Sequence, residues 1–204
     1  MRLSSRVAEN KSRMVIPSFG FMGEMASGKN TYADRLRDRM HEDLGISPLR
    51  VSFSSKIIEI ATDLFGMEGK DRHYLGEVGS KMREIDPAVW ANCVIREIER
   101  NGSPPFLADG LRFSFDDAQM RQKFPEFLVV RITADEAQRM EAYKRTYGRY
   151  PTKSELNNRG EGDMENIRED ITLFNDYSDG NREEQLGRIV ASIKDGSIAG
   201  LLRS

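Results

Sequence analysis

The residues whose types and spacing fit a chemical task lie between Gly23 and Thr31, in the stretch GEMASGKNT. This stretch matches the pattern G-x-x-x-x-G-K, with a threonine one position later than usual. Small residues let consecutive backbone N–H groups curl around an anion, and the positive end of the next helix points at the same place. The pattern therefore predicts a site for nucleotide phosphates. The residues expected to contact them are Gly23, Met25, Ala26, Ser27, Gly28, Lys29, Asn30 and Thr31.

The sequence on either side of this loop fits a strand before it and a helix after it. Residues 14–22 form a short apolar run suited to a buried strand, in which Pro17 is tolerated near the start or on an edge. After the loop, apolar residues recur every fourth position from Tyr32 to Leu44, and Gly45 is expected to end this helix. The predicted loop thus has the strand and the helix that it requires.

Length, composition and charge indicate a single globular domain. The chain has 204 residues, 31% charged and 38% apolar, enough for one α/β domain at residues 14–204 after a disordered tail at 1–13. Its net charge of −2 gives no global positive field, so no stable nucleic-acid partner is expected. No apolar run reaches the length of a membrane span, and the single Cys93, expected in the core, cannot form an internal disulfide. We expect a cytoplasmic protein without a membrane partner.

Strands and helices alternate along the rest of the chain. Strands are expected at 49–53, 106–109, 127–132 and 171–174, and helices at 54–65, 74–82, 87–98, 114–124, 133–143 and 186–193. This alternation predicts a parallel sheet with helices on both faces. Together with the phosphate-binding motif at Gly23–Thr31, it gives as the expected fold class the three-layer α/β fold of a P-loop NTPase. Ligands of such a sheet bind beyond the C-terminal ends of its strands.

Three of these helices carry candidate N-terminal caps. Ser54 precedes the helix expected at 54–65 and could accept a hydrogen bond from its first turn. Ser114 and Thr133 are each followed three residues later by an acidic residue, Asp117 and Glu136, as in a capping box. Both boxes are expected to begin helices.

Asp109 ends the apolar run that begins at Phe106, so its carboxylate is expected at the same edge of the sheet as the loop. A carboxylate there can hold magnesium through water or orient an acceptor group, although it could also cap a turn. Gly110 and Arg112 follow directly, which favours a functional role.

Two groups of arginines flank these motifs. Arg72, Arg83 and Arg112 could grip an acceptor phosphate, since the guanidinium fork binds phosphate through two hydrogen bonds, although each could instead be a solvated surface charge. Arg139, Arg145 and Arg149 lie close to a polar segment at about 144–166, which has the length and composition of a lid. A lid would exclude water and supply charge. The alternative is a solvated helix face followed by a loop.

Five stretches together match one family pattern. They are the G-K-x-T ending of the loop, Ser52–Ile57 against S-F-A-x-x-L-K, Arg72–Trp90 against R-x-x-L-Q-x-x-G…R…D-P…W, Asp109–Phe113 against D-x-R-F with one residue inserted, and Asn175–Leu186 against N-D-G-x-x-x-x-L. Through them the chain resembles, over about residues 14–195, the deoxynucleoside monophosphate kinases of the phage type. These belong to the P-loop nucleoside monophosphate kinases.

The resemblance implies ATP with Mg²⁺ on the loop and a (deoxy)nucleoside monophosphate as acceptor. The residues with implied catalytic roles are Lys29, Asp109, Arg139 and Arg145. Those implied to bind the substrate are Ser54, Lys56, Arg72, Arg83, Trp90 and Arg112. Magnesium would be held by Thr31 and Asp109, because Asn30 occupies the usual Ser or Thr position. Trp90 would either stack on the base or pack its own helix. The family also implies a possible homodimer, with the acceptor-binding helices at about 54–100 as the candidate interface, in the host cytoplasm if a phage encodes the chain.

Other functions remain open at this point. One is a P-loop kinase with a different acceptor: a modified pyrimidine in DNA, dephospho-coenzyme A or a small polyol. Another is a non-catalytic nucleotide switch. The carboxylate and the arginines argue against a switch, because a switch has little need of residues that bind an acceptor.

Overall fold

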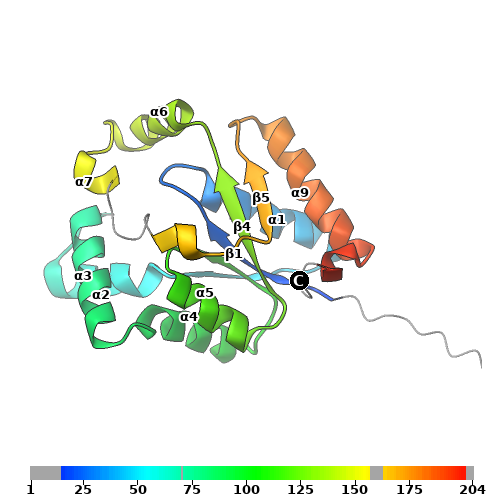
Figure 1. The fold of residues 1–204 in the computed structure, drawn as a ribbon, viewed down its shortest axis with the longest axis horizontal. Coiled ribbons are helices and arrows are strands. Elements are labelled where there is room, and N and C mark those ends of the chain that lie inside the picture. The colour runs from blue at the N-terminus through cyan, green and yellow to red at the C-terminus, as the bar shows by residue number, and fades with distance from the viewer. Residues whose placement is uncertain (1–14, 70, 157–162, 201–204) are drawn as a thin grey trace, which may run out of the picture.

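The computed structural model describes residues 15–69, 71–156 and 163–200, and its centre is a five-stranded sheet (Figure 1). The strands are β1 (Ser18–Met22), β2 (Leu49–Ser52), β3 (Phe106–Asp109), β4 (Phe127–Thr133) and β5 (Ile171–Phe174). They lie in the order β2-β3-β1-β4-β5, and every neighbouring pair is parallel. The predicted parallel α/β architecture is confirmed.

Helices cover both faces of the sheet (Figure 1). They are α1 (Lys29–Leu44), α2 (Ser55–Phe65), α3 (Arg72–Ile85), α4 (Val89–Arg100), α5 (Ser114–Lys123), α6 (Glu136–Tyr147), α7 (Lys153–Leu156) and α9 (Asp179–Lys194), with short 3₁₀ turns at Met164–Asn166 and Ser197–Gly200. One apolar core joins the sheet to α1 and α9, and a second joins it to α2, α3, α4 and α5. In the described ranges, no helix has the length and apolar content needed to cross a membrane.

Strand β4 shows how the sequence builds both cores. Phe127 and Val129 belong to the core under α4 and α5, whereas Leu128, Val130 and Ile132 belong to the core under α1 and α9. Successive side chains of a strand point to opposite faces, so a continuous apolar run is what a strand covered on both sides requires.

Local signals place several boundaries as predicted. Helix α1 lies between two glycines with left-handed backbone, Gly28 at φ 94° and Gly45 at φ 68°, and α2 ends at Gly66 with φ 63°. Pro17 directly precedes β1, where its missing N–H costs no hydrogen bond of the sheet.

The predicted capping boxes are wrong. Helix α6 begins after Asp135, whose carboxylate accepts from Gln138 N at 3.2 Å, while Thr133 is the last residue of β4. Helix α5 begins at Ser114, and the cap comes from Asp163, whose carboxylate accepts from Ser114 N at 2.5 Å. Both termini still gain a carboxylate acceptor, from a residue that the capping-box pattern does not identify.

Ser54 also makes no capping hydrogen bond to α2, although it occupies the predicted position. The predicted tail at residues 1–13 lies outside the described residues. So do residues 157–162 of the predicted lid.

Candidate active site

The predicted phosphate-binding loop joins β1 to α1 and has three residues with positive φ, of which Ala26 is strained because it is not glycine. Gly23, Ala26 and Gly28 have φ values of 144°, 60° and 94°. A Cβ atom on Gly23 would lie 2.3 Å from the backbone oxygen of Ile132 in β4, so only glycine fits against the neighbouring strand there. The loop therefore turns sharply at the C-terminal edge of the sheet, directly before the N-terminus of α1.

Side chains bind five consecutive carbonyl oxygens of this loop. Lys29 Nζ donates to the carbonyls of Gly23 and Glu24 at 2.7 Å each, Arg139 Nη1 to Met25 at 3.3 Å, Tyr177 Oη to Ala26 at 2.8 Å, and Asn175 Nδ2 to Ser27 at 2.9 Å. In a trans peptide the N–H points away from the C=O. Because side chains bind these carbonyls, the N–H groups of the same peptides point the other way, as an anion cradle requires, except that of Ser27, which donates to the Glu24 carbonyl at 3.2 Å.

Ser27 supplies a further donor inside the loop. It is fully buried, and its hydroxyl has no hydrogen-bond partner among the described residues. An unpaired buried hydroxyl costs free energy unless a ligand completes it. The loop, the helix N-terminus behind it and this hydroxyl together fit the phosphates of a nucleotide.

Arg139 lies under the loop and does not project from the predicted lid. Only 7% of the residue is exposed, and besides the Met25 carbonyl its guanidinium binds the Glu24 carboxylate at 3.0 Å. Arg145, one and a half turns further along α6, is exposed. Burial raises the pKa of the Tyr177 hydroxyl, and the positive charges of Arg139 and Arg145 oppose that shift, so both arginines act on the end of the site nearest Tyr177.

Asp109 lies at the C-terminal end of β3, next to Phe21 of β1 in the sheet. Its carboxylate is paired with Arg50 of β2, at 2.9 Å from Nη2, and Arg50 Nε also lies 3.2 Å from Asp34 of α1. Asp34 is one helical turn beyond Thr31, which is exposed. Thr31 and Asp109 offer the oxygen donors that Mg²⁺ prefers, and Arg50 is a charged neighbour that the sequence did not indicate.

Arg83 and Trp90 are engaged within the protein. Both guanidinium N–H₂ groups of Arg83 bind the Asp116 carboxylate, at 3.1 and 2.5 Å, and the Arg83 Cζ atom lies 3.9 Å from the centre of the Phe113 ring. Trp90 is 1% exposed, and its indole N–H donates to the Gly79 carbonyl at 3.0 Å. Of the two roles considered for Trp90, the structure therefore supports packing, and a base has no exposed ring face on which to stack.

The other residues predicted to bind the acceptor molecule lie near the ends of β2 and β3 or on the helices that follow β2. Ser54 Oγ lies 3.0 Å from Ser52 Oγ, at the turn between β2 and α2. Lys56 is exposed and pairs with Glu59 on its own helix. Arg112 is partly buried and lies three residues after the end of β3. The side chain of Arg72 lies outside the described residues.

The described part of the predicted lid is organised around Glu155. Its carboxylate accepts from Arg149 at 2.8 and 3.0 Å and from Tyr143 Oη at 2.8 Å, and it caps α7 through Thr152 N at 2.8 Å. The Arg149 guanidinium is the main cause that holds the pKa of Glu155 well below its ordinary value. Arg149 thus stabilises the segment between α6 and α7.

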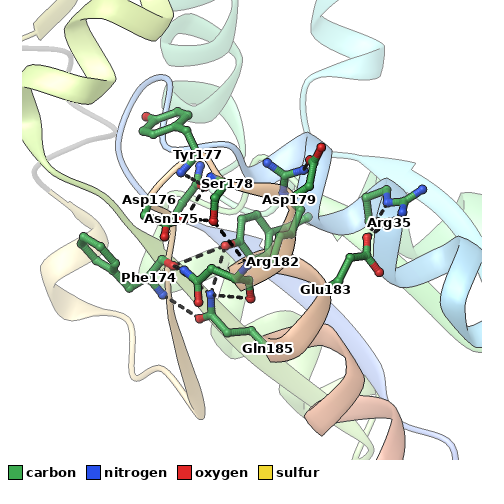
Figure 2. A network of polar contacts seen from close by, with 12 residues as sticks. Arg35, Phe174, Asn175, Asp176, Tyr177, Ser178, Asp179, Arg182, Glu183 and Gln185 are labelled. Carbon is green, nitrogen blue, oxygen red and sulfur yellow. Dashed lines mark hydrogen bonds and ion pairs between the residues drawn. The ribbon is translucent and has the colours of Figure 1, made fainter.

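Sequence reasoning missed the contribution of the segment between β5 and α9, which Figure 2 shows from close by. Asn175 and Tyr177 belong to a stretch that matched the family pattern, but nothing local indicates that they reach the loop 148 and 151 positions earlier. In the same network Gln185 binds both the N–H and the C=O of Phe174, at 2.9 and 2.8 Å, which fixes the end of β5.

Comparison with known proteins agrees with this architecture. No family model matches the chain. A UPF0200 protein from Methanoculleus marisnigri is 30% identical over 114 residues, which are 55% of this chain and 57% of that protein, so the chain spans less than two thirds of this relative.

Among solved structures, a gluconokinase from Sinorhizobium meliloti superposes with a TM-score of 0.53 at 16% identity, over 91% of this chain and 99% of that one. A shikimate kinase from Acinetobacter baumannii, in complex with shikimate, gives 0.52 at 16% identity over 90% and 96%. The chain therefore shares the α/β fold of these two kinases.

Proposed function

We propose that this chain is a P-loop kinase that transfers the γ-phosphoryl group of ATP to the phosphate of a (deoxy)nucleoside monophosphate. The observation that carries the proposal is the stretch from Gly23 to Ser27, whose carbonyls are all bound by side chains and whose peptides directly precede a helix N-terminus. Lys29 adds the charge that such a site places against the outer phosphates.

Thr31 and Asp109 offer oxygen donors that would hold Mg²⁺, which would supply positive charge against the phosphates. The chain itself supplies the remaining groups. Lys29 and the loop bind the donor phosphates, Arg145 lies on α6 beyond the strand ends, and Arg112 follows Asp109 on the acceptor side. A phosphate acceptor needs no strong base, because its oxygen is already ionised.

The acceptor is supported by the matches at Ser52–Ile57, Arg72–Trp90 and Asp109–Phe113. A second acceptor class is favoured by one observation: Arg83, expected to clamp the acceptor phosphate, is bound to Asp116 with only 15% of its side chain exposed. The gluconokinase and the shikimate kinase of similar fold are named for small hydroxylated acceptors. A small polyol or hydroxy acid is therefore the alternative.

The test is an ADP-release assay with ATP and MgCl₂ against two panels: nucleoside and deoxynucleoside monophosphates, and small polyols and hydroxy acids. Lys29→Ala is expected to lower kcat by about 10²–10³, because it removes a donor from the developing charge. Lys194→Ala is the matched control, since this lysine is half exposed at the far end of α9. It should retain wild-type turnover.

The outcomes separate the proposals. Turnover of one or a few monophosphates that depends on Lys29 supports the nucleotide acceptor. Turnover confined to the hydroxylated panel replaces it with the second class. ATP binding without turnover on either panel contradicts both and leaves a DNA acceptor or a nucleotide switch.

A further inference from the structure

Two strained residues meet at the phosphate-binding loop. In the described ranges, three non-glycine residues have left-handed backbone: Ala26 at φ 60°, Ser103 at φ 54° and Tyr177 at φ 63°. Such a conformation is strained for an L-residue, because its Cβ crowds the backbone. Ala26 and Tyr177 are joined by a hydrogen bond, from Tyr177 Oη to the Ala26 carbonyl at 2.8 Å. Strain that is concentrated at one contact indicates a functional constraint there.

Asn175 fixes Tyr177 in this conformation. Its Oδ1 accepts from Tyr177 N at 2.9 Å, and its Nδ2 donates to the Ser27 carbonyl at 2.9 Å (Figure 2 shows the first of these bonds). Asn175 is 1% exposed, so its amide is committed to these two partners. A glycine at position 177 would take the same φ without strain, but it would have no hydroxyl to reach the loop.

The bond from Tyr177 acts on a specific peptide. The Ala26 carbonyl belongs to the peptide whose N–H, that of Ser27, donates to the Glu24 carbonyl at 3.2 Å. Holding the carbonyl from outside therefore keeps the turn from Glu24 to Ser27 closed. The position of the buried Ser27 hydroxyl depends on this turn.

We propose that Tyr177 is a positioning residue for the donor nucleotide: its hydroxyl holds the Glu24–Ser27 turn in the conformation that receives the phosphates. The proposal rests on the proposed function of the loop as an ATP site. Tyr177 does not touch the reacting atoms, and it acts through the loop. The strained backbone is retained because the tyrosine hydroxyl makes this contact.

The experiment compares the wild type with Tyr177→Phe, which removes the hydroxyl and retains the ring, and with Tyr177→Gly, which also removes the strain. Ser103→Gly is the matched control, because it relieves a left-handed residue in the turn between α4 and β3, away from the loop. Affinity for ADP with MgCl₂ is measured by calorimetry, and stability by urea unfolding of the same proteins.

Tyr177→Phe is expected to weaken ADP binding about tenfold with little change in the urea midpoint, as the loss of one hydrogen bond to the site predicts. Tyr177→Gly should bind ADP at least as weakly while its midpoint stays at or above that of Tyr177→Phe. Ser103→Gly should bind ADP like the wild type. A purely structural role would lower the urea midpoint as well, so a loss of ADP affinity at an unchanged midpoint indicates positioning.

Two results overturn the inference in different ways. Wild-type affinity for ADP in Tyr177→Phe, whatever its urea midpoint, shows that the hydroxyl does not position the loop. Failure of the wild type itself to bind ADP refutes the proposed function, and this inference with it.

Discussion

Removing the carboxylate of Asp116 tests whether Arg83 belongs to the core. Asp116 is 1% exposed and accepts two hydrogen bonds from the Arg83 guanidinium, at 3.1 and 2.5 Å. In Asp116→Ala the guanidinium keeps its contact with the Phe113 ring and its bond to the Pro87 carbonyl, but it loses the Asp116 carboxylate with which it is paired. The variant thus leaves a largely buried charge without its counterion.

The expected cost follows from the burial of the pair. Burial raises the pKa of Asp116, and Arg83 offsets this only in part, so the pair as a whole gains little over its hydrated state. Breaking such a pair on one side costs about 3 kcal/mol, the lower end of the usual range, because 15% of the Arg83 side chain still reaches water. For a domain of this size that corresponds to a melting temperature lower by roughly 6–12 °C.

The assay is urea unfolding, followed by circular dichroism, of the wild type, Asp116→Ala, Arg83→Met and the double variant. The double variant should recover most of the loss, since no unpaired charge remains, and the coupling energy should exceed about 1 kcal/mol. A loss below about 1 kcal/mol in Asp116→Ala, or strict additivity in the double variant, would refute the reasoning. It would also return Arg83 to the list of candidate acceptor clamps.

Two further predictions concern the edge of the site. Arg50→Gln removes the partner of the Asp109 carboxylate, so the Mg²⁺ concentration for half-maximal turnover should fall about fivefold, equivalent to about 1 kcal/mol; an unchanged magnesium titration would argue against metal binding at Asp109. Arg149 lowers the pKa of Glu155 in the folded protein, so the Arg149–Glu155 ion pair stabilises the fold fully above about pH 4.3. This stabilisation is lost as the pH falls through the pKa of Glu155 in the folded state. Hydrogen-exchange protection of residues 147–156 should therefore decline at acid pH in the wild type and not in Glu155→Gln, and equal profiles would contradict this.

The sequence predicted those features that depend on neighbours within a few positions. The strand before the loop, the helix after it and the end of α1 before Gly45 follow from glycine backbone freedom and apolar spacing alone. The strand order of the sheet could not be predicted in this way, because it depends on which strands pair across long separations. Alternation of strands and helices indicated only that the strands would be parallel.

The partners of charged side chains could not be predicted. An arginine in the sequence shows a charge, but not the group that neutralises it. Arg83 binds a carboxylate 33 positions away, so it is not the exposed acceptor clamp that was expected. Arg139 binds a loop carbonyl 114 positions away, so it does not belong to the lid. The cap of α5 likewise comes from Asp163, 49 positions after the residue whose N–H it accepts.

The contact between Gln185 and Phe174 affects whether a strand of another molecule can pair with the edge of the sheet. Strand β5 is the last strand on its side of the sheet, so its outward peptide groups could pair with a strand of another molecule. A primary amide presents a donor and an acceptor side by side, and Gln185 uses them on the N–H and C=O of Phe174 as a sixth strand would. Helix α9 thereby occupies the outward peptide groups at this end of the edge, beside the exposed Phe174 ring, and hinders strand addition there.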